Sequence, residues 1–302
     1  MQVIGIGDNV CDLYLDRGMM YPGGQALNFA VNTRDLGLVS HYMGVFGTDE
    51  AAQQIKSVLV RRGIPFPKAQ TVPGENGRSW VELRDGDRVF LGSNKGGVLR
   101  EHPIHLDRED LGYLDHFLVA HTTNNSYFDG ELPYLKAHVS LVSYDYSTCW
   151  READRVARTA PYVDMAFLSC GEESVERAEE TARHLNAAGI TAVCVTLGSR
   201  GAAVWTGGDF LMQHAFPVQV VDTMGAGDAF ASRILAGVAE TLDQEGTACW
   251  RDEAWRYRVM REQLPSAAEF AAQACRREGA FGEGVPIPPG LRPGARPTGE
   301  SV

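Results

Sequence analysis

The sequence predicts an α/β fold, a doubly wound and mostly parallel sheet that carries a small β lid. The main observation is that short apolar runs alternate along the chain with longer amphipathic stretches, the pattern of strands joined by helices. A second observation is a strong hairpin signal, Asp85-Gly86 between two strand-like runs, which interrupts the alternation. The third is the length of 302 residues, which suits one large domain.

The strands and helices of the main sheet follow from this alternation. Strands are expected at residues 3–7, 117–121, 139–145, 163–168 and 191–197, and helices at residues 151–159 and 172–188. In a doubly wound sheet, ligands bind beyond the carboxyl ends of the strands. The residues that directly follow each apolar run are therefore the first candidates for a binding site.

Two segments that stand outside the alternation predict the lid. Residues 79–84 and 88–92 have the composition of a two-stranded hairpin, and the lid is assigned to residues 12–20 and 78–98. The whole compact domain is assigned to residues 1–282. Residues 283–302 are rich in proline and glycine and poor in apolar side chains, so a mobile tail is expected there.

Composition and charge exclude several classes of protein. A formal net charge of −11 would repel a phosphate backbone, so no nucleic-acid partner is expected. The apolar runs are shorter than the roughly 18–20 residues that cross a bilayer, so no membrane partner is expected either. The first residues resemble a strand rather than a secretory signal, and the six scattered cysteines resemble reduced core residues. A cytoplasmic location is predicted.

The segment 220–230 carries the most chemical information. It predicts a strand that leads through a glycine-rich turn into a helix. Consecutive small residues, Gly225, Ala226 and Gly227, let backbone N–H groups converge on an anion at the helix N-terminus. Asp228 begins the helix, where its carboxylate can accept a proton from an attacking hydroxyl. A helix cap would explain the acid alone, but not the Gly-Ala-Gly before it.

This segment, D-T-x-G-A-G-D-x-F, resembles the signature of the ribokinase-like, or PfkB-type, carbohydrate kinases. A second matching element lies near the N-terminus, where Gly23-Gly24 is followed by Asn28. The resemblance covers roughly residues 1–282 and implies a ribokinase-like fold and ATP-dependent phosphorylation of a sugar. It implies that Gly24 lets the sugar approach the backbone and that Asn28 binds its hydroxyls. The implied cofactors are ATP and Mg²⁺, with a monovalent cation such as K⁺ as a further candidate.

The resemblance also assigns residues to the two substrates. Asp12 falls on the family's sugar-binding acid, with Asp8 as a close neighbour, and Asn124 or Asn125 follows a strand on the pocket side or simply caps a loop. The expected nucleotide-binding residues are Thr196, Gly198, Gly201 and Thr223.

The sequence departs from the family pattern at the metal end. Many members carry Asn where this chain has Ser169, and Glu172 is the candidate that would act on the metal through water. Glu173 is an adjacent rival for that role. The missing Asn keeps a second hypothesis open, that of a catalytically silent protein that senses a sugar or a nucleotide.

Within the family, three segments most resemble the fructoselysine 6-kinases. These are residues 7–9, residues 145–147 and, above all, the lid residues 81–90. The implied reaction is phosphorylation of the 6-hydroxyl of fructoselysine or a related fructosamine; another sugar or nucleoside kinase stays the alternative. Residues 93–97 contain no carboxylate that would bind a lysine ammonium. The lid resemblance also implies a homodimer that pairs through this element.

A histidine pair and a group of aromatic residues are expected to have no role in the active site. His102 and His105 have metal-like spacing, but they flank Pro103 and lack acidic or cysteine companions, so solvated side chains are expected. Trp250, Trp255 and Tyr257 have the spacing of the packing stripe of an amphipathic helix.

Overall fold

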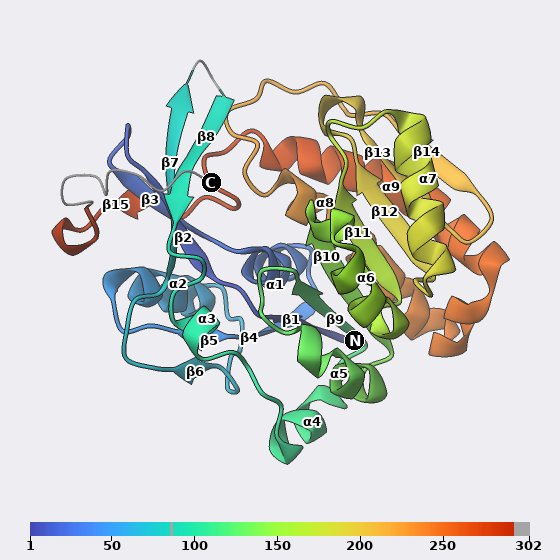
Figure 1. Ribbon diagram of the computed structural model, residues 1–302, viewed down its shortest axis with the longest axis horizontal. Helices are drawn as coiled ribbons and strands as arrows, with labels where there is room; N and C mark the ends of the chain where they lie inside the picture. The colour runs from blue at the N-terminus through green and yellow to red at the C-terminus, as the bar shows by residue number, and fades with distance from the viewer. Residues whose placement is uncertain (85–86, 293–302) are drawn as a thin grey trace.

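The computed structural model describes residues 1–84 and 87–292, and it contains the predicted doubly wound sheet (Figure 1). Eight strands run in the order β14-β13-β12-β11-β10-β9-β1-β4, and all neighbours are parallel except at β12-β13-β14. The strands are β1 (Gln2–Ile6), β4 (Val39–Met43), β9 (Val119–Thr123), β10 (Leu141–Ser147), β11 (Met165–Ser169), β12 (Ala192–Thr196), β13 (Ala202–Trp205) and β14 (Phe210–Gln213).

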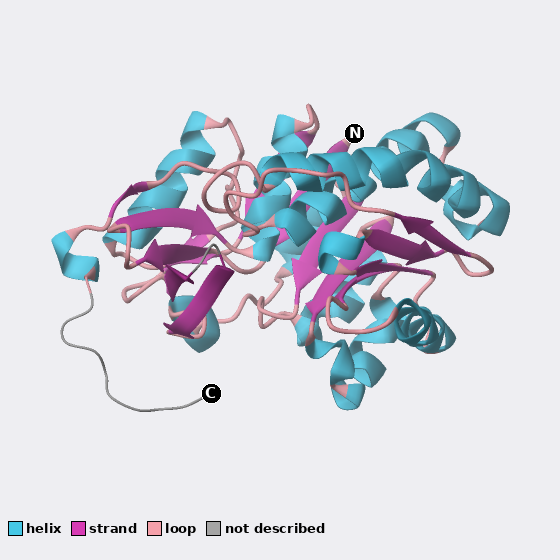
Figure 2. Ribbon diagram, turned by 90° about the horizontal axis from the view of Figure 1, so that it is seen from above, coloured by secondary structure: helices cyan, strands magenta, loops and turns pink. Residues whose placement is uncertain are grey.

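Helices cover both faces of this sheet, as Figure 2 shows. One face packs against α1 (Gln25–Asp35), α8 (Ala226–Glu245) and α9 (Glu253–Ala274). The other packs against α4 (Arg108–Leu114), α5 (Leu132–His138), α6 (Ala153–Thr159) and α7 (Val175–Ala187). Alternate residues of each strand enter the two cores, as Val3 and Ile4 do, because successive side chains in a strand point to opposite faces. Burial on both faces explains why these strands are continuous apolar runs in the sequence, rather than runs in which apolar and polar residues alternate.

The predicted lid is a second, five-stranded sheet with the order β15-β3-β2-β7-β8. Its strands are β2 (Val10–Tyr14), β3 (Met19–Gly23), β7 (Gly77–Arg84), β8 (Asp87–Ser93) and β15 (Val285–Pro286). The hairpin of β7 and β8 is confirmed, and its predicted turn, Asp85-Gly86, lies outside the described residues. The excursion expected at residues 12–20 is a β2-β3 hairpin that begins at Val10 and ends at Gly23.

A third group of short elements joins the two sheets. The remaining helices are α2 (Glu50–Arg61) and α3 (Val98–Glu101), and a small parallel pair is formed by β5 (Val45–Phe46) and β6 (Gln70–Thr71). Asp49 precedes helix α2 as its cap, with its carboxylate accepting the Ala52 N–H, and the buried face of α2 packs under the lid sheet. This packing makes the lid a supported layer rather than an isolated hairpin.

The predicted tail begins too early. Val285 and Pro286 form β15, which pairs with β3, and Ile287 and Leu291 are buried against α2. The Glu283 carboxylate accepts hydrogen bonds from Arg61 and Arg62, and these guanidinium groups hold its pKa below the usual value. Packed structure therefore extends past residue 282, and residues 293–302 lie outside the described part of the chain.

Replacing Ile287 with alanine should lower the free energy of unfolding by about 2–5 kcal/mol, because the side chain is 4% exposed and its removal leaves a cavity. Val220→Ala, at a position that is 51% exposed, is the control and should change stability little. Urea denaturation of both variants measures the difference. Equal stability of the two variants would contradict a packed role for this segment.

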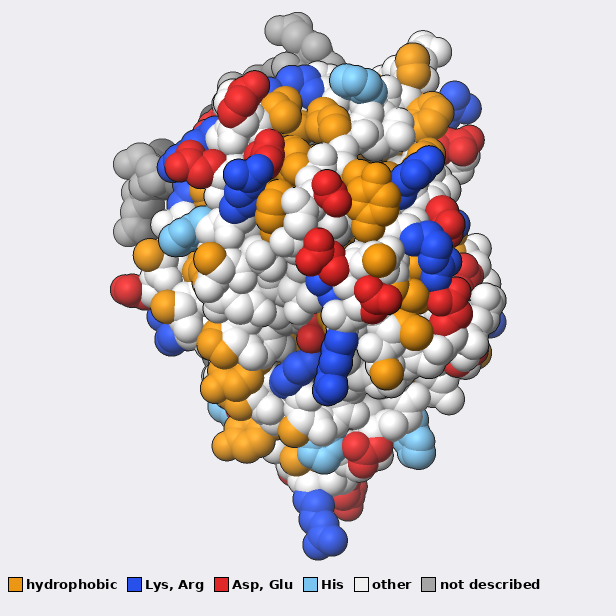
Figure 3. All heavy atoms as spheres, turned by 90° about the vertical axis from the view of Figure 1, so that its right-hand side faces the viewer, with side chains coloured by type: hydrophobic (Ala, Val, Ile, Leu, Met, Phe, Trp, Pro, Cys, Tyr) orange, Lys and Arg blue, Asp and Glu red, His pale blue; other side chains and the backbone are white. Residues whose placement is uncertain are grey.

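Other sequence expectations concern packing and surface. Trp250 and Trp255 are buried in the core beneath α8 and α9, as the stripe predicts. All six cysteines lie within the described residues, and none of them forms a disulfide. No helix in the described part of the chain is long and apolar enough to span a membrane. Figure 3 shows acidic and basic side chains interspersed over the face at the right of Figure 1.

Candidate active site

A cavity of about 380 Å³ lies between the lid and the carboxyl ends of the main strands. Five of the predicted site residues line it, and they come from four separate parts of the chain: Asp8, Asp12, Gly24, Asn28 and Asp228. Its other lining residues are Val10, Gln25, Arg78, Ser79, Phe90, Ser93, Lys95, Gly96, Asn125, Tyr127 and Met224. The edge where these residues meet is the one at which ligands bind in doubly wound sheets.

The glycine-rich turn forms the start of α8 as predicted. Gly225 is the residue before the helix and has a left-handed backbone, with φ of 74°. A Cβ atom there would lie 2.6 Å from the Ala280 Cβ, so only glycine fits. No side chain caps the first turn, which leaves backbone N–H groups of a 20-residue helix directed at the space before it. Such an end favours an anion.

Asp228 and Asn28 meet across the cavity. The Asn28 amide donates from Nδ2 to the Asp228 carboxylate at 2.5 Å, which joins α1 to α8. The Asn28 Oδ1 atom is buried and accepts no hydrogen bond within the described structure. A buried acceptor without a donor costs free energy, and a ligand hydroxyl would satisfy it. The predicted role of Asn28 in sugar binding is therefore supported by a buried hydrogen-bond acceptor that a ligand can satisfy.

Asp8 borders the cavity as expected, and its carboxylate also binds the protein backbone. Its carboxylate accepts the backbone N–H groups of Gln25 at 2.8 Å and Ala26 at 3.1 Å, and the Thr123 hydroxyl at 2.9 Å. These bonds fix the N-terminus of α1, and burial raises the pKa of Asp8. Both Asp8 carboxylate oxygens accept hydrogen bonds from the protein, so the main role of Asp8 is to hold the start of α1.

Asp12 lies on β2 and forms the lid side of the cavity. Its side chain is 4% exposed, and Gly23 on the neighbouring strand leaves room for it, since a Cβ at Gly23 would lie 3.2 Å from the Asp12 carboxylate. Tyr14 follows two residues later on the same strand, and its hydroxyl donates to Asp222. Asp222 in turn accepts the Met224 N–H at 2.9 Å. Strand β2 thus supports the turn that leads to Gly225.

Asp145 is an acid near this site that sequence analysis did not assign. Burial, followed by the nearby charge of Asp228, raises the pKa of Asp145 to about 8. Its carboxylate accepts the Ser147 N–H at 2.6 Å, and Ser147 has a left-handed backbone with φ of 49°. The protonated form of the Asp145 carboxyl group is therefore favoured around neutral pH.

Comparison with known proteins agrees with this geometry. The model of the pfkB family of carbohydrate kinases matches residues 3–280. The chain belongs to this family. The protein is therefore a phosphotransferase that acts on a carbohydrate.

The pfkB family kinase has two informative curated relatives. The chain is 36% identical over 287 residues to fructosamine kinase FrlD of Bacillus subtilis (strain 168), with 95% of each chain covered. It is 33% identical over 249 residues to fructoselysine 6-kinase of Escherichia coli (strain K12), covering 81% of this chain and 94% of the relative.

Solved structures confirm the ribokinase-like fold. Ribokinase from Giardia lamblia superimposes with a TM-score of 0.79 at 15% identity, covering 93% of this chain and 95% of the other. A Vibrio cholerae fructokinase with fructose, ADP and potassium ion bound has a TM-score of 0.71 at 21% identity, with 95% of each chain covered.

In this pfkB kinase, the residues expected to bind nucleotide lie outside the cavity lining. Thr196 ends β12, and its hydroxyl donates to the Leu168 carbonyl. Gly198 has open space around its Cα, whereas a Cβ at Gly201 would lie 2.1 Å from the Gln213 carbonyl oxygen. Gly201 is thus required by the neighbouring strand β14. Thr223 and Glu172 are both exposed.

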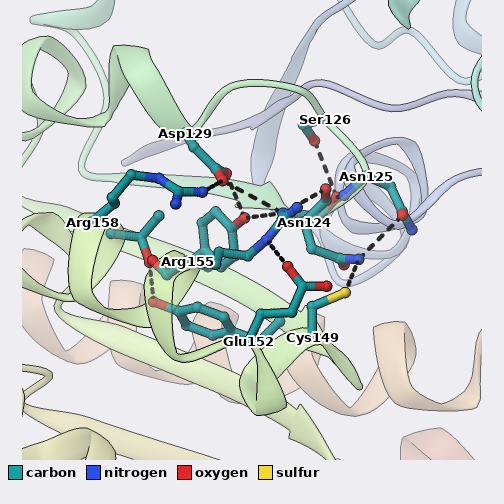
Figure 4. Close-up of polar contacts among 12 residues, drawn as sticks. Asn124, Asn125, Ser126, Asp129, Cys149, Glu152, Arg155 and Arg158 are labelled. Carbon is teal, nitrogen blue, oxygen red and sulfur yellow. Dashed lines mark hydrogen bonds and ion pairs between the residues drawn. The ribbon is translucent and has the colours of Figure 1, made fainter.

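Of the two asparagines expected at the pocket, Asn125 lines the cavity of the kinase and Asn124, the first choice, does not. Figure 4 shows both side chains. Asn124 lies behind the loop, where its amide donates to Cys149 at 3.3 Å. Asn125 donates from Nδ2 to Gln25 at 3.0 Å. The two side chains are neighbours, since the Asn124 Nδ2 donates to the Asn125 Oδ1 at 3.2 Å, and no sequence signal decides which of them faces the ligand.

Proposed function

We propose that this pfkB kinase transfers the γ-phosphoryl group of ATP to the 6-hydroxyl of a fructosamine. The observation that carries the proposal is the Asn28–Asp228 pair, which stands in one cavity with the uncapped start of α8. The vacant Asn28 Oδ1 suits a sugar hydroxyl. The names of the two curated relatives support a fructosamine as the acceptor.

Asp228 accepts the proton of the attacking sugar hydroxyl while the hydroxyl oxygen forms a bond to the γ-phosphorus of ATP. The bond from that phosphorus to the bridging oxygen breaks, and ADP leaves with the electron pair. The N–H groups at Gly225 and Gly227 stabilise the charge on the transferred group at the uncapped start of α8. The Ala226 N–H donates to the Thr223 carbonyl at 3.3 Å and would exchange that bond for a phosphoryl oxygen. Asn28 and Asp12 hold the sugar hydroxyls. Catalysis of this kind depends mainly on positioning and charge.

The nucleotide would lie beyond the carboxyl end of β12, along Thr196, Gly198, Gly201 and Thr223. The described residues contain no cluster of three His, Cys, Asp or Glu side chains that could hold a metal ion. When bound with ATP, Mg²⁺ would neutralise charge on the phosphates. Glu172 is exposed in the turn after β11, where it would contact the ion through water.

A substrate panel tests the proposal. ADP release at fixed Mg-ATP is measured with fructoselysine, other fructosamines, fructose, ribose and nucleosides. The expected result is the highest kcat/KM on a fructosamine. Highest activity on ribose or a nucleoside would overturn the proposed substrate, and no ADP release with any sugar would favour the catalytically silent sensor.

Repeating the assay with choline in place of K⁺ tests the monovalent cation, which should raise kcat. Because ATP is the donor, we place the reaction in the cytoplasm.

The lid should close over the bound sugar and also join two subunits into a homodimer. Phe90 lines the cavity and is 55% exposed, and Leu91 is 39% exposed, so β8 presents apolar surface to a ligand and to a partner. Closure would exclude water from the phosphoryl group.

Hydrogen exchange should show added protection in residues 79–92 when sugar binds, and the mass of the protein in solution should be that of a dimer. Unchanged exchange would refute closure, and a monomeric mass would refute the dimer.

A further inference from the structure

One end of the cavity differs chemically from the end that holds Asp228. Asp8 and Asp12 are buried and Asp228 is half-buried, so the inner part of the cavity is acidic, whereas the exposed side chains Phe90, Lys95 and Tyr127 form its rim. Phe90 and Tyr127 are large side chains that are 55% and 42% exposed. The rim therefore has two aromatic rings and an ammonium group, which suit a different part of a ligand from the hydroxyl-binding end.

The backbone of this rim is held in an unusual conformation. Lys95 and Tyr127 both have left-handed backbones, with φ of 53° and 52°, which side chains other than glycine rarely adopt. The Tyr127 hydroxyl donates to the Lys95 carbonyl at 2.7 Å, and the Lys95 N–H donates to the Ser93 hydroxyl at 3.2 Å. Strained residues of this kind tend to cluster where a ligand is held.

The loop that carries Tyr127 is fixed from behind (Figure 4). Arg155 on α6 donates to the Asn124 carbonyl at 3.0 Å and to the Tyr144 hydroxyl at 3.2 Å. Tyr144 donates to Asp129 at 2.6 Å, so the loop is tied at both of its ends. A loop held in this way keeps Tyr127, and through it Lys95, in one place.

Lys95 supplies the available positive charge at this rim. Arg78 also borders the cavity, but its guanidinium group pairs with Glu75 at 2.5 Å and lies 4.0 Å from Asp49. No acidic side chain among the described residues pairs with the Lys95 ammonium, and the side chain is exposed. Its natural partner is an anionic group on the ligand.

We infer that Lys95 selects fructosamines whose amine portion is an amino acid, by pairing with its carboxylate. The inference rests on the proposed fructosamine kinase function and adds the part of the substrate that the lid end recognises. With the 6-hydroxyl at Asp228, the nitrogen at the opposite end of the sugar is directed away from the catalytic end. Phe90 and Tyr127 flank the carbon atoms of the amine portion, and the Lys95 ammonium binds its carboxylate.

Matched substrates test this assignment. Three acceptors are compared in the ADP-release assay: the fructose adduct of glycine, the adduct of glycinamide, and free fructose. The wild-type kcat/KM should be about two- to five-fold higher for the glycine adduct than for the glycinamide adduct. Lys95→Gln should remove that preference and leave kcat/KM for free fructose unchanged. Lys68→Gln, which removes a surface lysine paired with Glu109, is the control and should keep the preference.

The outcomes separate two failures. If Lys95→Gln retains the preference, or the wild-type enzyme uses both adducts equally, the Lys95 assignment is wrong and the fructosamine kinase function stands. If the wild-type enzyme phosphorylates fructose but neither adduct, the proposed substrate is wrong, and the Lys95 assignment falls with it. Lys95→Glu should prefer the glycinamide adduct, because its carboxylate repels the glycine adduct.

Discussion

Replacing Asp228 with asparagine should lower kcat by about 10²–10⁴, the usual contribution of a general base. Asparagine keeps the size of the side chain and can still accept a hydrogen bond from Asn28, so the contact between α1 and α8 survives. The binding of ATP and the melting temperature should change little. Initial rates, nucleotide calorimetry and thermal unfolding measure the three quantities.

Asp154→Asn is the control for Asp228→Asn, because Asp154 also lies in the first turn of a helix but outside the cavity. Its kcat should equal that of the wild-type enzyme. An Asp228→Asn enzyme that keeps more than about a tenth of wild-type kcat would remove Asp228 from the role of base.

Asn28→Ala and Asp12→Ala should weaken sugar binding far more than ATP binding. Each lost hydrogen bond that involves a charged group is worth roughly 1.5–3 kcal/mol, or about ten- to a hundred-fold in Kd. Asn28→Ala also removes the donor to Asp228, so its kcat should fall as well. Calorimetry with sugar and with a nucleotide measures the two affinities separately.

Asn32→Ala is the matched control for Asn28→Ala. Asn32 lies one turn later on α1, is equally buried, and does not line the cavity. Its sugar affinity should stay at the wild-type value. Unchanged sugar binding in both Asn28→Ala and Asp12→Ala would place the sugar elsewhere.

The parts of the site that could be predicted from sequence are those with a strict backbone requirement. Gly225 must be left-handed, and the helix after it must begin within one residue, so the turn and Asp228 could be located from the motif. The hairpin of β7 and β8 was equally accessible, because Asp-Gly between two apolar runs has few other structures.

The parts that failed depend on contacts between distant segments. Asp8 follows the first strand and borders the cavity as expected, but its bonds to the N-terminus of α1 could not be predicted from the sequence. The proline-rich C-terminal residues pack because Ile287 and Leu291 join the core cluster that contains the buried face of α2. The sequence does not identify Lys95 as a site residue, because its position at the cavity depends on the Tyr127 and Ser93 contacts that hold its left-handed backbone.

The position of β15 limits how two subunits can join. A sheet has two edges whose backbone groups lack partners, and here β15 covers β3 on one side with a short strand that contains Pro286. Strand β8 is the long edge that stays uncovered in the described lid sheet. Two lids that pair strand to strand would therefore meet at β8, related by a two-fold axis, in one continuous sheet across both subunits. In such an assembly, each Phe90, which lies on β8 and lines a cavity, would be close to the boundary between the two subunits.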